Sequence, residues 1–459
     1  MPTDVLTLAD RLWRGELSTT TMHPVDHVGG FVEITDGVGF TPSFANVSAF
    51  NTGDGLVLVD TGSLPLAEVV HADIRRWSNA PLHTAVYSHG HIDHVFGVPV
   101  WEQEAREQGW KAPEVIAHHA LPARFDRYIF TAGYNTIINR RQFGFKDLTW
   151  PTSYRYPDRT YHEVLELSVG ELDFTLRHEK GETDDHTVTW QASSRVLCCG
   201  DLFIWASPNA GNPQKVQRYP REWAQALRRM LTLEAEFLLP GHGLPVVGAD
   251  RVRQALTDTA DLLDSLVDQT LAVMNSGGRL DDAIHSVRPP AELEERPYLR
   301  PVYDEPEFIV HTVWRQYGGW WDGNPATLKP ASERALAAEL AALAGGAGVL
   351  AERALELLAR ATGAADDGAA DDGAADDGAA DDSAADDSAA EQDLRLAGHL
   401  AESAWLSSPA DRAVQRARQQ VFAARAARAT STMARGVFTW AASESVPEVH
   451  GEDGSLHGH

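Results

Sequence analysis

Basic residues, cysteines and long apolar runs are all scarce in this chain of 459 residues. Lysine and arginine total 39 against 66 acidic residues, which gives a formal net charge of −27 at pH 7. Nucleic-acid binding depends on lysine and arginine contacts to phosphate, so this balance argues against a nucleic-acid partner. No apolar segment has the length of a membrane span. Residues 1–17 lack the basic start and apolar middle of a secretory signal, so we expect a cytoplasmic protein.

The two cysteines, Cys198 and Cys199, are neighbours in an apolar run. A disulfide between adjacent residues would be badly strained, so we expect two reduced packing residues in a buried strand. The hydrophobic content of 43% is enough for real cores, and the length predicts two domains.

Part of the acidic excess lies in a low-complexity segment at residues 363–390. There a unit GAADD, and then SAADD, repeats five times and contributes ten aspartates. Such a segment has little to bury and repels itself, which predicts a disordered insertion, and it lacks the ligand spacing of a calcium-binding EF-hand loop. Stretches rich in Ala, Leu, Arg and Glu predict paired antiparallel helices around it at 331–344, 348–361, 391–407 and 409–428.

The most informative stretch is Ser88-His89-Gly90-His91-Ile92-Asp93-His94, which places four potential metal ligands within six residues. The residues before it have a strand pattern and those after it suit a helix, so the cluster lies on a strand-to-helix loop. Alternate side chains of such a loop can serve two centres, His89 and His91 one, and Asp93 and His94 the other. Imidazole and carboxylate ligands suit zinc and related first-row ions.

Three further candidates occupy well-separated places. His186 directly precedes a strand-like run, Asp201 ends the apolar run 195–201, and His242 follows the apolar run 237–239 in a Gly-His-Gly turn. Each adjoins a strand pattern and a glycine-containing bend, where the binding residues of layered α/β folds tend to lie. All three are therefore expected at one edge of a sandwich.

HGHIDH, a later histidine, an aspartate that closes a strand and GHG together resemble the metallo-β-lactamase-fold hydrolases, and residues 51–62 resemble their early strand. The resemblance implies an α/β fold, an αβ/βα four-layer sandwich with a dinuclear metal site at one edge. It also implies that Asp60 orients a ligand through a hydrogen bond. By that pattern the first metal is bound by His89, His91 and His186, the second by Asp93, His94 and His242, and Asp201 bridges them.

The resemblance narrows to the alkylsulfatase branch of this fold. Residues 302–306 and 317–325 resemble its helical dimerisation region, and residues 132–141 resemble a segment that helps to form its substrate pocket. This implies a homodimer with a catalytic domain at 1–275, an all-helical dimerisation domain at 276–442 and a disordered tail at 443–459. The sterol-carrier-like domain at the C-terminus of typical members is not matched here.

The pocket departs from the pattern of that branch. Typical alkylsulfatases have a glutamate where His186 stands, usually a glutamate as the bridging acid, and a sulfate-binding asparagine and arginine after it. Asn209 can supply the asparagine, but the nearby cations are Lys215 and Arg218, and lysine lacks the planar fit of guanidinium to an oxyanion. The substrate-binding residues implied by the resemblance are Arg140, Arg141, Asn209, Lys215 and Tyr317.

These patterns predict hydrolysis of a small anionic ester, with an alkyl sulfate as the leading substrate class. A hydroxide that bridges two divalent ions would be the nucleophile, with Asp201 holding the ions and Asp93 orienting the hydroxide or accepting its proton. Zn²⁺ is favoured, with Fe or Mn as alternatives. A thioesterase or lactonase, or a phosphodiesterase, could use the same centre. A non-enzymatic helical assembly module with a structural metal is disfavoured by the open coordination of a bridging aspartate and water.

The remaining histidines carry no metal-ligand spacing. His118, His119, His178 and His311 have no companions at ligand distance along the sequence, and we expect structural roles for them. The histidines at 450, 457 and 459 fall in the predicted tail, where they could bind metal adventitiously.

Overall fold

The structure is a computed structural model that describes residues 4–26, 30–363 and 379–445, without the side chains of 379–386. The chain packs as two compact units. The first comprises Met1–Thr136 and Thr149–Gly323, and the second comprises Ile137–Leu148 and Asn324–His459.

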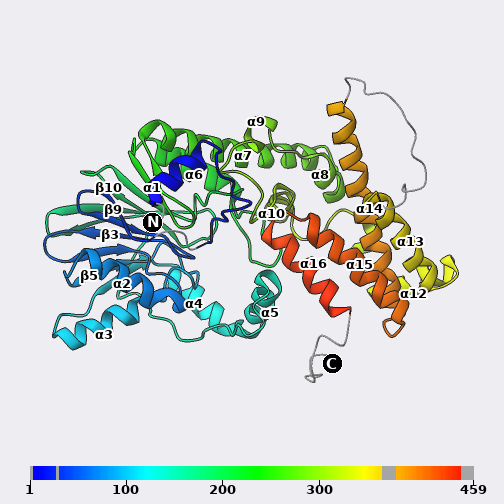
Figure 1. Ribbon diagram of the computed structural model, residues 1–459, viewed down its shortest axis with the longest axis horizontal. Coiled ribbons are helices and arrows are strands. Elements are labelled where there is room, and N and C mark those ends of the chain that lie inside the picture. Colours follow the sequence, from blue (N-terminus) through cyan, green and yellow to red (C-terminus); the bar gives the residue numbers. More distant parts are fainter. Residues whose placement is uncertain (1–3, 27–29, 364–378, 446–459) are drawn as a thin grey trace. The chain divides into compact units, whose positions relative to one another are not determined.

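Two mixed sheets form the centre of the first unit (Figure 1). In the first sheet the strands follow the chain order, antiparallel from β1 to β4 and parallel from β4 to β7. Its strands are β1 Val32–Thr35, β2 Val38–Thr41, β3 Val47–Asn51, β4 Leu56–Val59, β5 Leu82–Val86, β6 Glu114–His118 and β7 Arg159–Tyr161.

The second sheet has the strand order β13-β12-β11-β10-β9-β8, in which only β11 and β12 are parallel neighbours. Its strands are β8 Val164–Val169, β9 Leu172–Glu179, β10 His186–Gln191, β11 Val196–Gly200, β12 Phe237–Pro240 and β13 Val246–Val247. Cys198 and Cys199 are free and buried in β11, as expected.

Three apolar layers explain why the sheets stack. Between the sheets, Phe50 meets Phe174 at 5.2 Å in an edge-on contact within one buried cluster. The outer face of the first sheet packs on Ile74, Trp101 and Phe125, and that of the second sheet packs on a cluster around Trp223 and Leu263. Strands β4 and β11 are buried along their whole length, which is typical of strands covered on both faces.

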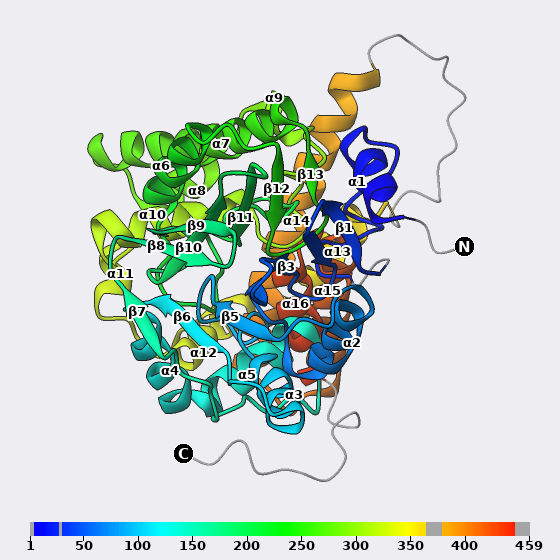
Figure 2. The same cartoon turned by 90° about the vertical axis from the view of Figure 1, so that its left-hand side faces the viewer.

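Helices cover the outer faces of both sheets (Figure 2). The first sheet is covered by α2 Ala67–Trp77, α3 Val98–Gln108 and α4 Leu121–Phe130, with the short η1 Leu64–Leu66 before α2. The second is covered by α1 Val5–Trp13, α6 Pro220–Leu231 and α7 Ala249–Asn275. The predicted αβ/βα four-layer sandwich is therefore confirmed.

The boundary between the units differs from the expected domain boundary at residue 275. Helices α8 Leu280–Ser286, α9 Ala291–Glu294 and α10 Pro306–Gly318 belong to the first unit. The reason is that Ile309, Val310 and Val313 of α10 are buried in the same cluster as Trp223 and Leu263. The second unit instead takes residues 137–148, which include the end of α5 Ala132–Phe143.

The second unit is helical in its described part. It contains α11 Pro325–Leu328, α12 Glu333–Ala344, α13 Ala347–Ala361, α14 Ala379–Ser407, α15 Arg412–Arg428 and α16 Thr432–Glu444. The four predicted helices in this region correspond to α12 to α15. Their ends agree within a few residues, except that α14 begins earlier than predicted. Within the described chain no single helix has the length and apolar composition of a membrane span, and α12 and α13 reach that composition only as a pair bent by 85°.

The predicted disordered insertion at 363–390 is only partly within the described residues. Residues 364–378 lie outside them, but 379–390 form the first turns of α14, so the expectation of disorder there was wrong. Alanine has the highest helix propensity, which favours helix here despite the repeated aspartates. Of the predicted tail at 443–459, residues 446–459 lie outside the described residues.

Candidate metal centre

One group of potential ligands gathers at the carboxyl ends of the strands. It comprises His89, His91, Glu182 and Asp201, whose ligand atoms lie within 4.8 Å of one another. Glu182 Oε2 is 3.4 Å from His89 Nε2 and 3.3 Å from His91 Nδ1, and the two histidine nitrogens are 2.7 Å apart. All but His91 are buried.

A second group comprises Asp93, His94 and His242. Asp93 Oδ2 is 3.6 Å from His94 Nε2 and 3.5 Å from His242 Nε2. Asp201 reaches both groups, because its carboxylate oxygens lie 3.7 Å from His89 Nε2, 3.4 Å from His94 Nε2 and 3.3 Å from His242 Nε2. Its position between the groups is the one that the resemblance implied.

Backbone geometry brings the strand ends this close. The ligands of the first loop follow β5, Asp201 follows β11, and His242 follows β12, the parallel neighbour of β11. A side chain at Gly241 would place its Cβ 2.1 Å from Asp201 Oδ1, so only glycine fits there. Gly200 has a φ of +50°, a left-handed conformation that glycine adopts readily.

The donor set fits two divalent cations. Ligand atoms about 2.0–2.1 Å from a tetrahedral zinc ion lie about 3.3–3.4 Å from one another, close to most of the separations here. His94 Nε2, Glu182 Oε2 and Asp201 Oδ1 are among the buried side-chain atoms that have no hydrogen-bond partner in the described chain, and His186 Nδ1 beside them is another. Buried polar atoms are normally satisfied, so these three atoms indicate a missing ligand for each.

The charges within the site favour ionised carboxylates and a neutral His91, whereas Asp201 outweighs the effect of burial and raises the pKa of His94 and of His242. Burial raises the pKa of Asp201. The neighbouring His242, His94 and His89 lower it by a larger amount, so the pKa of Asp201 lies well below its usual range. The pKa of Glu182 is also well below its usual range, because His91 and Arg218 outweigh the effect of burial. Burial lowers the pKa of His91 to about 4. Ionised carboxylates and neutral imidazoles are the species that coordinate cations.

Two aspartates hold the first ligand loop in place. Asp60 Oδ2 lies 2.7 Å from His94 Nδ1, which leaves His94 Nε2 facing Asp201. Asp60 Oδ1 accepts a hydrogen bond from the Ser88 backbone N–H at 2.7 Å. The role implied for Asp60 matches this contact. Asp185, which the sequence did not single out, accepts from the Gly90 N–H at 2.9 Å and pairs with Arg124 at 2.8 Å.

His186 belongs to neither ligand group, which differs from the expected ligand set, although its ring stacks on that of His89 with centroids 5.2 Å apart. Its Nε2 accepts a hydrogen bond from the backbone N–H of Asp201 at 3.2 Å, so that lone pair is occupied. Glu182, four residues earlier, takes the place in the first group. The reason is the loop 180–185, which turns Glu182 toward His89 and His91, whereas His186 is the first residue of β10.

The predicted substrate residues that follow Asp201 contact Glu182 or lie close to it. Asn209 Nδ2 donates to Glu182 Oε1, so its amide orients a candidate ligand, and its contact with a substrate stays a prediction. Arg218, which is 1% exposed, lies 3.4 Å from the same oxygen. The half-buried Lys215 lies 5.5 Å from the Trp150 ring, with Asp93 and Glu182 among the charges that act on it. Burial and Arg218 lower the pKa of Lys215 to about 7.

The other predicted substrate residues are not joined to this group by any contact that the structure describes. Arg140 donates to the Leu148 carbonyl at 2.7 Å, and the Arg141 guanidinium lies 5.7 Å from the Trp440 ring, both within the second unit. Tyr317 is 47% exposed near the end of α10. Their substrate contacts stay predictions.

Tyr303 is a further residue that the sequence did not single out as a site residue. Burial raises its pKa well above the usual range, and Asp93, Glu182 and Asp201 raise it further. The negative charges of carboxylates in both groups therefore act on the Tyr303 phenol. Only its position in the resembling segment 302–306 pointed to it in the sequence.

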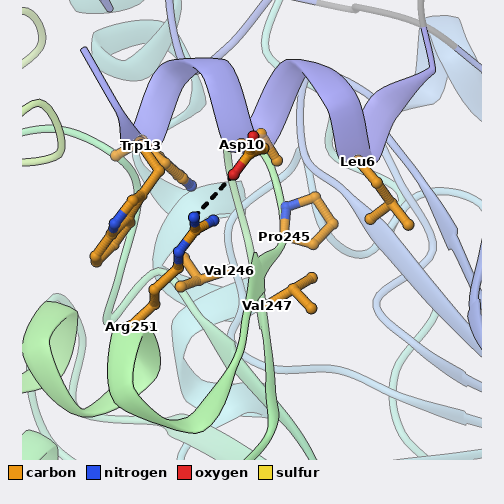
Figure 3. Close-up of a pocket in the computed structure, with 9 residues that line it drawn as sticks. Leu6, Asp10, Trp13, Pro245, Val246, Val247 and Arg251 are labelled. Carbon is orange, nitrogen blue, oxygen red and sulfur yellow. Dashed lines mark hydrogen bonds and ion pairs between the residues drawn. The ribbon is translucent and has the colours of Figure 1, made fainter.

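A cavity of about 210 Å³ lies apart from these ligands, beneath α1 (Figure 3). The Asp10 carboxylate and the Arg251 guanidinium pair across it at 2.8 Å. None of its lining residues is a predicted ligand: they are Leu6, Ala9, Asp10, Trp13, Trp205, Pro245, Val246, Val247 and Arg251.

Two known families match successive parts of the chain. Residues 40–242 match the family model of the metallo-beta-lactamase superfamily, and residues 279–365 match that of alkyl sulfatase dimerisation.

Similar proteins include a linear primary-alkylsulfatase of Pseudomonas sp., 26% identical over 64% of this chain and 59% of that protein. An alkyl/aryl-sulfatase of Saccharomyces cerevisiae is 24% identical over 76% of this chain and 57% of that protein. The solved stereoselective inverting sec-alkylsulfatase Pisa1 from Pseudomonas sp. shares the fold, with a TM-score of 0.76 and 20% identity over 92% of this chain and 66% of that one. The chain thus spans less than two thirds of the length of these relatives.

Proposed function

Because the chain combines a metallo-β-lactamase domain with an alkylsulfatase dimerisation region, we propose that it is a metal-dependent hydrolase of alkyl sulfates or related small anionic esters. The observation that carries this proposal is the convergence of two ligand groups on the carboxylate of Asp201. The sulfatase specificity is supported by relatives that are named alkylsulfatases.

We assign two divalent cations to these groups, with Zn²⁺ favoured and Fe or Mn as alternatives. His89, His91 and Glu182 would hold the first ion, Asp93, His94 and His242 would hold the second, and Asp201 would contact both. When bound, such ions supply a water molecule that loses its proton near neutral pH and stabilise negative charge that develops on the ester.

The residues of the chain supply orientation and proton transfer. The Asp93 side chain is 18% exposed, whereas that of Asp201 is 6% exposed, so Asp93 is the more accessible carboxylate to orient water or accept its proton. Asp60 fixes the ring of His94. Lys215, whose charge interacts with Asp93 and Glu182, supplies positive charge for the anionic group of an ester when it is protonated, which its pKa of about 7 favours below neutral pH.

A thioesterase or lactonase would use the same ligands on a carbonyl carbon, and a phosphodiesterase would use them on phosphorus. We expect one metal-loaded preparation, assayed against an alkyl sulfate, an acyl thioester, a lactone and a phosphodiester, to give its highest kcat/KM on the alkyl sulfate. A preference for the thioester or lactone would favour the carbonyl alternative. Activity that persists undiminished after metal removal would contradict the whole proposal.

We also propose a homodimer, in keeping with the match to the dimerisation family. Leu336, Leu340 and Leu343 of α12 lie within the matched residues, share one helical face by their spacing, and are 57%, 41% and 84% exposed. Leu340→Asp is expected to shift the chain toward the monomer, because it places a charge in an apolar contact.

Mass measurement by light scattering over a concentration series checks this prediction. Val164→Asp is the control, since Val164 has a matched exposure of 42% and lies on β8 of the first unit. Equal masses for the two variants at every concentration would rule out this face of α12.

A further inference from the structure

Four histidines that are distant in sequence meet at one edge of the sandwich. His118 ends β6 and His119 follows it, His162 follows β7, and His178 lies in β9. His118 belongs to the first sheet, His119 and His162 directly follow strands of that sheet, and His178 belongs to the second sheet. The sheets are joined beside them, because the Tyr161 hydroxyl hydrogen-bonds to Thr187 Oγ1 at 2.9 Å. Structural roles were expected for three of these histidines, but their grouping was not.

The four imidazole rings form a chain of contacts in the order His178, His118, His119 and His162. His118 Nε2 and His119 Nδ1 are 2.9 Å apart. The rings of His118 and His178 are parallel with centroids 3.6 Å apart, and those of His119 and His162 are 4.0 Å apart. Protonation of more than one ring would place like charges in contact, which costs free energy. Neutral rings can donate lone pairs to a metal ion.

The surroundings hold the His178 ring in a form suited to coordination and keep the His118 ring neutral. The Nε2 of His178 lies 2.9 Å from the Asp184 carbonyl oxygen, so Nε2 carries the proton and Nδ1 keeps its lone pair. A metal-binding histidine typically donates its other ring N–H to a backbone carbonyl in this way. Burial, with His178 and His119, lowers the pKa of His118 to about 4, but both nitrogens of this ring have partners: Nδ1 accepts from the Ala120 backbone N–H at 3.4 Å and Nε2 lies 2.9 Å from His119 Nδ1.

We propose that His118, His119, His162 and His178 bind one divalent transition-metal ion that clips the two sheets together, separate from the candidate metal centre. The all-imidazole set suits Zn²⁺, Cu²⁺ or Ni²⁺ and does not suit Ca²⁺ or Mg²⁺, which take oxygen ligands. His118 and His178 stack face to face, so binding requires one of these two rings to turn as well as rotation of His119 and His162. His119 and His162 are exposed, and exposed side chains change rotamer readily.

Counting bound Zn²⁺ tests this inference. In a full-length chain whose histidines at 450, 457 and 459 are replaced by alanine, equilibrium dialysis against Zn²⁺ is followed by elemental analysis. His119→Ala/His162→Ala is expected to bind about one ion fewer than its parent chain. It should also lose part of the rise in Tm that Zn²⁺ gives the parent, since an ion that binds only the folded chain stabilises it. Equal ion counts and equal Zn²⁺-dependent shifts in Tm would overturn the proposal.

Two further variants make the result specific. His285→Ala, at another exposed histidine, should bind as many ions as the parent. His89→Ala/His91→Ala should lose metal from the candidate metal centre and keep the ion of the four-histidine cluster, so the cluster can be confirmed even if no ester is hydrolysed. If the double variant of the cluster fails to fold by circular dichroism, His162→Ala alone gives the same comparison at one exposed position.

Discussion

Asp201→Asn is expected to lower kcat/KM at least ~10³-fold, which corresponds to about 4 kcal/mol of lost transition-state stabilisation. Its carboxylate lies within 3.7 Å of ligand nitrogens from both groups, so the substitution removes the one negative charge that both ions would share. Asparagine keeps the volume and one oxygen, and the loss would therefore report charge and coordination, not packing. The measurement is steady-state kinetics together with metal content per chain.

Asp258→Asn is the matched control for this prediction. Asp258 is a buried aspartate of α7 that contacts the Tyr298 hydroxyl at 2.5 Å and Arg296 at 2.8 Å, and it takes no part in either ligand group. It should cost stability and leave metal content and kcat/KM of the folded enzyme close to those of the parent. Full metal content and activity in Asp201→Asn would show that Asp201 does not join the two groups.

The ligand loop could be predicted because its ligands are local in sequence. His89, His91, Asp93 and His94 occupy a single loop after β5, so their proximity follows from the strand-to-helix pattern alone. Asp201 and His242 were found because each ends an apolar run, and parallel neighbours β11 and β12 bring such ends together.

Glu182 could not be chosen from the sequence, because Glu182, Asp184, Asp185 and His186 stand within five residues. Which of them faces the ligands depends on how the loop turns, and three of them have other partners. Asp184 and Asp185 pair with Arg124, and His186 bonds to the Asp201 backbone. The glutamate of typical alkylsulfatases was the one signal that pointed away from His186.

Long-range packing limited the other predictions. Only the structure shows that Ile309 and Val313 of α10 pack in the core of the first unit. The four-histidine cluster depends on strand register, since His118 and His178 are sixty residues apart and belong to different sheets. No spacing rule along the sequence detects such a pair.

Glu182→Gln and His186→Ala together decide between the two ligand sets for the first ion. Glu182→Gln removes the charge of a carboxylate that lies 3.4 Å from His89 Nε2 and 3.3 Å from His91 Nδ1. We expect it to weaken binding of the first ion more than ~100-fold, the upper range for disturbing a residue that only supports a ligand. Metal content after dialysis and kcat/KM are the measurements, and both should fall.

His186→Ala should keep two ions per chain and lose stability, because it leaves a cavity beside β10 and the Asp201 N–H without its acceptor. Its kcat/KM should fall far less than that of Glu182→Gln, since Asp201 remains in place. At position 182 glutamine is a better test than alanine. Arg218 and Asn209 both contact Glu182 Oε1, and a truncated side chain would leave the buried guanidinium unpaired. The opposite outcome, with metal lost from His186→Ala and retained in Glu182→Gln, would restore the ligand set that the sequence predicted.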